Sequence, residues 1–275
     1  VVDDSQRHGG ERRPRATSGG APRRGPRTER DTRWSGPGRA RPAQPQSTGD
    51  GEGAAENAPD IPADVDAKQL APEIRRELST LDRVTADAVA RHLLAAGDLL
   101  DEDPEAALSH ARAARARTSR IAAVREAVGI AAYRCGDWSQ ALAELRAARR
   151  MGSKSSLLAL IADCERGLGR PERAIELARG PEAADLSGDD ADELRIVAAG
   201  ARADLGQLEQ ALTVLSTPQL EPGRSGSTAA RLYYAYADTL LALGRDDEAL
   251  EWFLRSAAAD LEGVTDAEER VSELG

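Results

Sequence analysis

The sequence is poor in aromatic residues and cysteine, and each shortage narrows what the chain can be. Aromatic residues make up 3% of the 275 residues, so a hydrophobic core must be built mainly from aliphatic side chains. The two cysteines, Cys135 and Cys164, lack the CxxC spacing of a metal or redox site. We expect them to be packing residues rather than a disulfide or a metal pair.

Strand-like alternation and long apolar runs are also lacking. No run approaches the length that crosses a membrane, and the first residues have no apolar stretch typical of a secretory signal. A cytoplasmic protein without a membrane partner is therefore expected. Of the 37 basic residues only Lys68 and Lys154 are lysines, and this arginine bias, together with the abundant alanine, indicates a high-GC, bacterial coding sequence.

Catalytic motifs are lacking as well. The three histidines, His8, His92 and His110, belong to no Ser/His/Asp or Cys/His signature, and no glycine-rich phosphate loop follows a strand. Acidic pairs such as those at 189–190 and 246–247 fall at loops or helix starts, where they favour the helix dipole. We therefore expect a protein that is not an enzyme and has no cofactor and no metal.

One stretch, residues 122–150, has the pattern of two helices joined by a tight turn. Apolar residues recur at helical spacing on both sides of Gly136 and Asp137, which interrupt the pattern. Gly136 supplies a turn conformation that other residues reach only with strain, and Asp137 is expected to cap the second helix, with Gln140 completing a capping box. Gly129 is expected where the two helices approach most closely.

The step from a turn glycine to an alanine five residues later recurs and predicts five such units. An earlier unit has Glu102 in place of the glycine. The second-helix alanines are separated by 34, 33, 37 and 38 residues. The turn glycines are Gly136, Gly169, Gly206 and Gly244, and the alanines are Ala107, Ala141, Ala174, Ala211 and Ala249.

In register and spacing these units resemble tetratricopeptide repeats, whose period is about 34 residues. The resemblance covers roughly two thirds of the chain and implies an all-α, right-handed helical solenoid of about five helix-turn-helix repeats. The longer intervals contain residues 181–190 and 218–227, which we expect to be loops, with Pro181 and Pro218 cutting the preceding helices short. The family's small-residue position in the first helix is filled by Ala95, Gly129, Ala162, Ala199 and Ala237.

The ends of the chain differ from the repeats. Leucine and isoleucine at positions 70 to 81 predict an amphipathic helix over 67–82 that caps the solenoid, and 264–274 is expected to cap the other end. The predicted domains are a disordered basic arm and acidic linker (1–60), an N-terminal capping helix (61–84), the repeats (85–262) and a C-terminal capping helix or tail (263–275).

Charge is distributed unevenly. Residues 1–45 hold eleven arginines against five acidic residues, a net charge of +6, and too little apolar surface to fold. Because the whole chain carries −10, residues 46–275 carry −16. The arm could fold back on this acidic surface or seek an acidic partner such as RNA. Residues 110–150 are locally basic, which we interpret first as a solvated helix surface.

The resemblance also implies a binding surface, because the first helices of such arrays line a concave groove. This predicts a scaffold for protein–protein interaction that binds a peptide segment or helix. The alternative is an RNA- or ribosome-associated factor acting through the arm. The partner-binding residues are expected to be Tyr133, Arg134, Asp163, Arg166, Tyr234 and Asp238, and further lining positions to be His92, Glu126, Ile130, Ile196 and Arg231.

Overall fold

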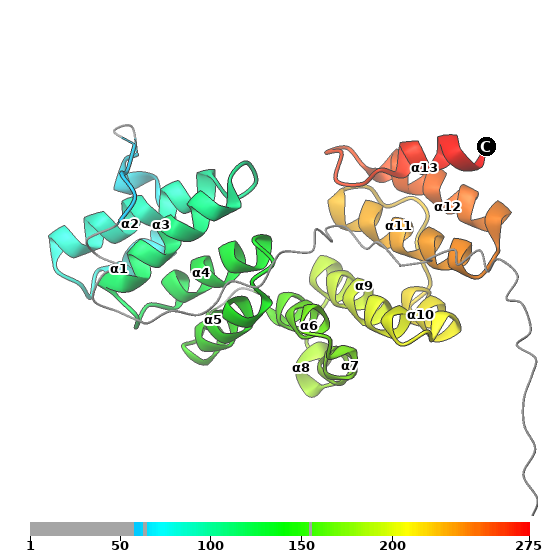
Figure 1. Ribbon diagram of the computed structural model, residues 1–275, viewed down its shortest axis with the longest axis horizontal. Helices are drawn as coiled ribbons and strands as arrows, with labels where there is room; N and C mark the ends of the chain where they lie inside the picture. Colours follow the sequence, from blue (N-terminus) through cyan, green and yellow to red (C-terminus); the bar gives the residue numbers. More distant parts are fainter. Residues whose placement is uncertain (1–57, 63–64, 154–155) are drawn as a thin grey trace, which may run out of the picture. The chain divides into compact units, whose positions relative to one another are not determined.

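The computed structural model describes residues 58–62, 65–153 and 156–275, and every regular element in them is a helix (Figure 1). The predicted disordered arm and most of the acidic linker, residues 1–57, lie outside the described residues. The elements are η1 (Ala67–Gln69), α1 (Pro72–Leu78), α2 (Arg83–Asp98), α3 (Pro104–Arg117), α4 (Ala122–Arg134), α5 (Trp138–Arg150), α6 (Leu158–Gly167), α7 (Pro171–Ala178), α8 (Pro181–Ala184), α9 (Gly188–Asp204), α10 (Leu208–Leu215), α11 (Ser227–Ala242), α12 (Asp246–Ala259) and α13 (Ala267–Leu274).

Five consecutive hairpins occupy the stretches where five units were predicted. They pair α2 with α3, α4 with α5, α6 with α7, α9 with α10, and α11 with α12. The small residues predicted at the helix crossings are buried in both helices of each pair. The five second-helix alanines are all 0% exposed, as expected where a neighbouring helix leaves no room for a larger side chain.

Four of the five hairpin turns have the same backbone geometry. Gly136, Gly169, Gly206 and Gly244 have φ angles of 73°, 75°, 73° and 75°, in the left-handed region that favours glycine. Each glycine N–H donates to the carbonyl three residues earlier, and the next N–H donates to the carbonyl five residues before itself, at 2.8–3.0 Å. These bonds satisfy the last carbonyls of the first helix, so the glycine both ends that helix and sets the start of the second.

The cap of α5 is only half of the expected capping box. Asp137 Oδ1 accepts a hydrogen bond from the Gln140 backbone N–H at 3.1 Å, as predicted. The Gln140 side chain instead accepts from Arg112 of α3. The Asp137 N–H is already taken by the Ala132 carbonyl of the preceding helix, at 2.9 Å, so the reciprocal bond of the box has no free donor.

Gly129 marks the close approach of α4 and α5, as predicted. A Cβ built at Gly129 would lie 2.7 Å from the Cγ of Leu145 and 3.1 Å from its backbone nitrogen. The absent side chain therefore lets Leu145, which is 0% exposed, pack directly on the α4 backbone. Any larger residue would have to push the two helices apart.

The hydrophobic core is a succession of clusters rather than one centre. Val128, Leu145 and Ile161 belong to a cluster that extends from α2 to α6, and Leu158 and Leu194 belong to the next, shared by α6, α7 and α9. Apart from α1, which also reaches α4, each helix packs on its own partner and on the adjacent pairs. Such nearest-neighbour burial is how repeat arrays build a core.

The predicted helix over 67–82 is two shorter elements, η1 and α1. An α-helix that ran from residue 67 through Pro72 would need the Pro72 N–H to donate to the carbonyl of residue 68. Proline has no N–H, so Pro72 is instead the first residue of α1. Leu78 is 1% exposed against α2 and α4, and Glu77 Oε2 accepts from the Ala123 N–H at 3.3 Å. A carboxylate from α1 thus caps α4, whose own N-cap residue, Ile121, offers no side-chain cap.

The two longer intervals differ from each other. Residues 181–190 were expected to be a loop, but α8 forms at Pro181 and α9 already begins at Gly188. Residues 218–226 carry no helix, as predicted, and α11 begins at Ser227. The preceding second helices, α7 and α10, have 8 residues each against 13 in α5, which confirms that they are cut short.

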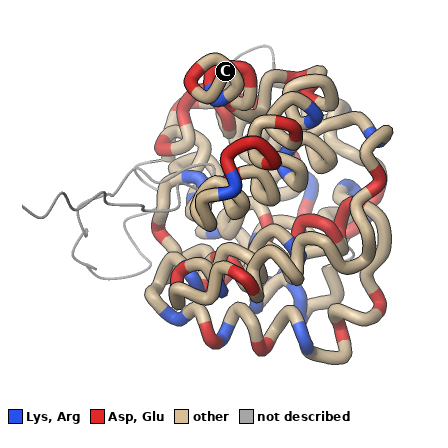
Figure 2. Tube along the Cα trace, turned by 90° about the vertical axis from the view of Figure 1, so that its right-hand side faces the viewer, with Lys and Arg blue, Asp and Glu red and all other residues tan. Residues whose placement is uncertain are grey.

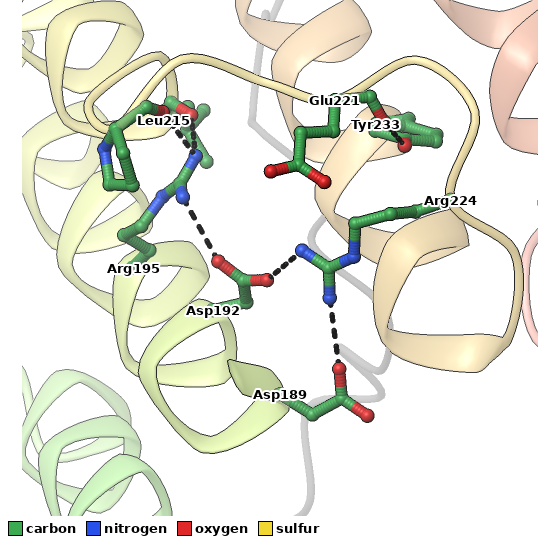
Figure 3. Close-up of polar contacts among 8 residues, drawn as sticks. Asp189, Asp192, Arg195, Leu215, Glu221, Arg224 and Tyr233 are labelled. Carbon is green, nitrogen blue, oxygen red and sulfur yellow. Dashed lines mark hydrogen bonds and ion pairs between the residues drawn. The ribbon is translucent and has the colours of Figure 1, made fainter. Parts of the chain in front are cut away.

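A buried carboxylate holds the connection between α10 and α11 (Figure 3). Asp192 of α9, 5% exposed, accepts from Arg195 at 2.9 Å and from Arg224 of the connection at 2.5 Å. Arg224 also binds Asp189 at 2.9 Å, and Arg195 donates to the Leu215 carbonyl at the end of α10. The connection is therefore fixed to α9 by charged hydrogen bonds in addition to the apolar packing of Leu220, which is 8% exposed in a cluster with Ile196.

Acidic and basic residues are interspersed over the described helices, with short runs of one sign (Figure 2). The basic run at 110–150 is not simply a solvated surface, as first interpreted. Arg115 and Arg125 both donate to Glu144, which is 7% exposed, at 2.7 and 2.8 Å. This pairing links α3, α4 and α5, so part of the arginine excess serves internal ion pairs.

Candidate functional site

The six predicted partner-binding residues lie on three of the first helices, but the structure brings only some of them together. Tyr133 and Arg134 end α4, Asp163 and Arg166 lie on α6, and the remaining two, Tyr234 and Asp238, lie on α11. Three of the six are joined directly by hydrogen bonds. The others have separate surroundings.

The joined residues form a row of side chains that crosses three first helices. The Tyr133 hydroxyl of α4 donates to Asp163 Oδ2 of α6 at 2.6 Å. Arg166 donates to Asp163 Oδ1 at 2.7 Å and, from its Nε, to Asp204 of α9 at 3.0 Å. We call Tyr133, Asp163, Arg166 and Asp204 the first-helix row. The exposed fractions of the Asp163, Arg166 and Asp204 side chains are 21%, 10% and 20%, so the row lies at the surface without projecting far from it.

The tyrosine of this row is held by packing as well as by its hydroxyl. Its ring meets Trp138 edge to face, with centroids 5.2 Å apart and planes at 75°. Trp138 occupies the space that Gly167 leaves open, since a Cβ at Gly167 would lie 2.5 Å from the indole. Burial, and then the charge of Asp163, raises the pKa of the Tyr133 hydroxyl, which therefore stays a hydrogen-bond donor.

Asp204 and Trp138 were not predicted as part of the site. Asp204 is the last residue of α9 and Trp138 the first of α5. Asp204 stands two residues before the turn glycine Gly206, as Arg134 stands two before Gly136. The repeat register could therefore have predicted which face of α9 carries Asp204. It could not have predicted that Asp204 pairs with an arginine on another helix.

Arg134 lies apart from the first-helix row. It pairs with Asp101 in the turn between α2 and α3, where the two side chains are 47% and 77% exposed. Ion pairs this exposed are screened by water and contribute little to stability. Arg134 is therefore the predicted residue that is most available to a partner.

Tyr234 and Asp238 face the C-terminal helix α13. The Tyr234 ring lies edge to face on Phe253, with centroids 5.2 Å apart, and burial and Asp266 raise the pKa of its hydroxyl. Burial also raises the pKa of Asp238 to about 6, although Arg270 of α13, 3.7 Å away, opposes the shift. Contacts within the chain therefore already engage these two residues.

Two further lining positions are buried, contrary to the prediction. Ile196 is 8% exposed and His92 is 1% exposed. The Nδ1 atom of His92 lies 3.0 Å from the Nδ1 atom of His110 on α3, so in the neutral pair one ring donates and the other accepts. His92 therefore belongs to the α2–α3 contact and not to an open groove.

The cysteines pack as expected and remain free thiols. Cys164 is 0% exposed, and burial raises the pKa of its thiol to about 12. The Cys135 thiol, half buried, donates to the Pro104 carbonyl at 3.2 Å. Raised pKa values disfavour the reactive thiolate, so neither thiol is poised for nucleophilic chemistry.

Within the described part of the chain, no three His, Cys, Asp or Glu side chains converge as a metal site. None of the described helices combines the length and apolarity needed to cross a lipid bilayer. Comparison of the sequence with protein-family models and with curated proteins gave no match. The geometry of the helices and of the first-helix row is therefore the basis for assigning a function.

Proposed function

We propose that the chain is a non-enzymatic scaffold, a right-handed helical solenoid of the tetratricopeptide type that holds a segment of another protein along its first helices. The four equivalent glycine turns and the five buried alanines support repetition of one structural unit. The succession of core clusters supports an array in which each unit is stabilised by its neighbours. Such arrays present extended surfaces suited to peptide segments.

The observation that carries this proposal is the first-helix row. Hydrogen bonds between Tyr133, Asp163, Arg166 and Asp204 connect α4, α6 and α9, the first helices of three consecutive pairs. Each of these side chains is thereby ordered before any partner arrives. A partner that binds here loses little additional side-chain entropy, which favours affinity.

The chemistry of the row suits a polypeptide partner. A tyrosine supplies a large contact area with few rotatable bonds, and an arginine supplies several directed donors, so these residue types dominate the energetics of many interfaces. Carboxylates beside them can accept backbone N–H groups of an extended segment. Arg134, the last residue of α4, adds an exposed cation on one of the same helices, although it lies outside the row.

Capture of partners from native lysate by the full chain, with and without RNase, tests this proposal. Arg134→Glu should weaken capture by on the order of tenfold. Arg150→Glu is the matched control, because Arg150 is exposed at the end of the second helix α5. Thermal melting should be the same for both variants and the parent, since exposed ion pairs contribute little.

Two outcomes would contradict the scaffold proposal. Capture that disappears with RNase would indicate RNA-mediated association, and would point to the basic residues 1–45, which lie outside the described residues. Equal loss of capture in Arg134→Glu and Arg150→Glu would show a general response to charge rather than a site on the first helices.

A further inference from the structure

A hollow of about 470 Å³ lies at the third hairpin, and none of the residues of the first-helix row lines it. Side chains of α5, α6 and α7 and the start of α8 line it. Its walls combine four arginines with three glutamates, and Leu158, Leu177 and Pro181 supply apolar surface. The charged lining residues are Arg146, Arg149, Arg170, Arg173, Glu165, Glu176 and Glu182.

The hollow follows from the short helix α7. In the register that aligns Ala141 with Ala174, Arg146 and Arg149 of α5 correspond to positions 179 and 182, beyond the last residue of α7. Gly180 and Pro181 redirect the chain there into the single turn of α8 (Figure 1). The second half of α5 therefore lies beside Gly180, Pro181 and α8 instead of a continuation of α7.

The ion pairs of the hollow are of two kinds. Glu165 has a side chain 4% exposed and accepts from Arg146 at 2.6 Å and from Arg170 at 3.4 Å, so it belongs to the floor. The outer pairs are open to water. Arg149 pairs with Glu182 and Arg173 pairs with Glu176, both at 2.7 Å, and the two glutamate side chains are 59% and 64% exposed.

In an exposed ion pair of this kind, the arginine can easily exchange its glutamate for another carboxylate. Each such pair contributes little in water, so an incoming carboxylate can replace the glutamate without a large loss. The replacement is favoured when the ligand brings apolar surface as well, because the partly exposed Leu177 then gains contacts that the glutamates do not provide. A guanidinium can bind a carboxylate through two parallel hydrogen bonds.

We propose that this hollow binds a short acidic peptide segment that also carries a leucine-sized apolar side chain, its carboxylates held by Arg149 and Arg173. The apolar surface that Leu177 and Pro181 contribute to the hollow favours such a ligand over a bare phosphate, which has no apolar part to bury. The charge of −16 on residues 46–275 opposes long polyanions such as nucleic acid, which carry a much larger charge into the same field. No residue of the first-helix row lines this site, so the proposal for the hollow and the proposal for the row can be refuted independently of each other.

The test compares arginine variants and glutamate variants, which should change peptide binding in opposite directions. Arg149→Gln and Arg173→Gln remove the cations that hold the ligand and should each weaken binding about tenfold. Glu176→Gln and Glu182→Gln remove the competing carboxylates and should strengthen binding about two- to fivefold. Arg150→Gln and Glu172→Gln are matched controls on α5 and α7, because both residues are exposed and neither lines the hollow.

The measurement is fluorescence anisotropy of a short fluorescein-labelled peptide of alternating leucine and glutamate residues, with the full chain at low ionic strength. An alternating leucine and glutamine peptide and inorganic phosphate serve as competitors. The proposal requires saturable binding, competition by neither, weakening by the arginine variants and strengthening by the glutamate variants. Absence of binding, or binding that responds alike to lining and control variants, overturns it. If phosphate competes as well as the unlabelled leucine–glutamate peptide does, the proposed requirement for an apolar side chain is wrong, and the hollow is only a general anion site.

Discussion

The buried histidine pair predicts a specific loss of stability in mild acid. His92 and His110 are 1% and 4% exposed, and their Nδ1 atoms face each other at 3.0 Å, so a proton added to both would place two donors against each other. Burial, followed by Arg117, His110 and Arg91, lowers the pKa of His92 from 6.5 to about 4. Burial also lowers the pKa of His110.

The direction of the effect follows from proton linkage. Between pH 6.5 and 4 the unfolded chain binds a proton at His92 that the folded chain does not, so stability falls as the pH decreases. The contribution of the neutral His92 to stability is fully present above pH 6.5, the pKa of the unfolded residue. From the two pKa values, lowering the pH from 7 to 5 should cost about 2 kcal/mol at this residue alone.

The assay is urea unfolding of the full chain at both pH values, for the parent and for His92→Asn. Asparagine places an amide group near the position of Nδ1 but does not titrate, so the variant should lose about 2 kcal/mol less than the parent between pH 7 and 5. Carboxylates elsewhere titrate alike in both proteins and cancel in the difference. Equal losses in parent and variant would refute the reasoning, whatever the variant's stability at pH 7.

Three further substitutions, two of them paired with a matched control, probe the packing of the hairpins, and all are measured by urea unfolding. Gly129→Ala should destabilise by about 1–3 kcal/mol, because its Cβ would lie 2.7 Å from a leucine side chain of α5, whereas Gly97→Ala, with nothing within 4 Å, should stabilise by about 0.5–1 kcal/mol. Ala174→Leu should cost about 1–3 kcal/mol and Ala143→Leu, at an exposed site on α5, almost nothing. Glu144→Gln should cost about 1–3 kcal/mol, since it weakens two charged hydrogen bonds to arginines. Equal effects within either matched pair, or a neutral Glu144→Gln, would contradict these assignments.

The hairpins could be predicted from sequence because backbone geometry restricts the residues at a few positions. A φ near 75° favours glycine, as at Gly136, and a close helix crossing requires a small residue, as at Gly129 and Ala141. These constraints are local and periodic. Sequence spacing alone therefore located the turns and the buried alanines.

The candidate site was harder to predict, because it depends on which side chains from different helices meet. Register placed Tyr133, Asp163 and Arg166 on first helices, but not the hydrogen bonds that join them to one another and to Asp204. The same register placed His92 in a groove, although a histidine on the partner helix allows it to be buried. Such pairings depend on three-dimensional distances that no spacing pattern contains.

Site-specific photo-cross-linking tests the central claim most directly, because it reports which helix face a bound partner touches. Ala203 occupies in α9 the place that Tyr133 occupies in α4, three residues before the turn glycine, and Ala143 lies exposed on the second helix α5. A photoreactive residue at Ala203 should yield cross-links to a protein segment that persist after RNase treatment, while one at Ala143 should yield none. Cross-links from Ala143 without any from Ala203 would contradict the assignment of partner binding to the first helices.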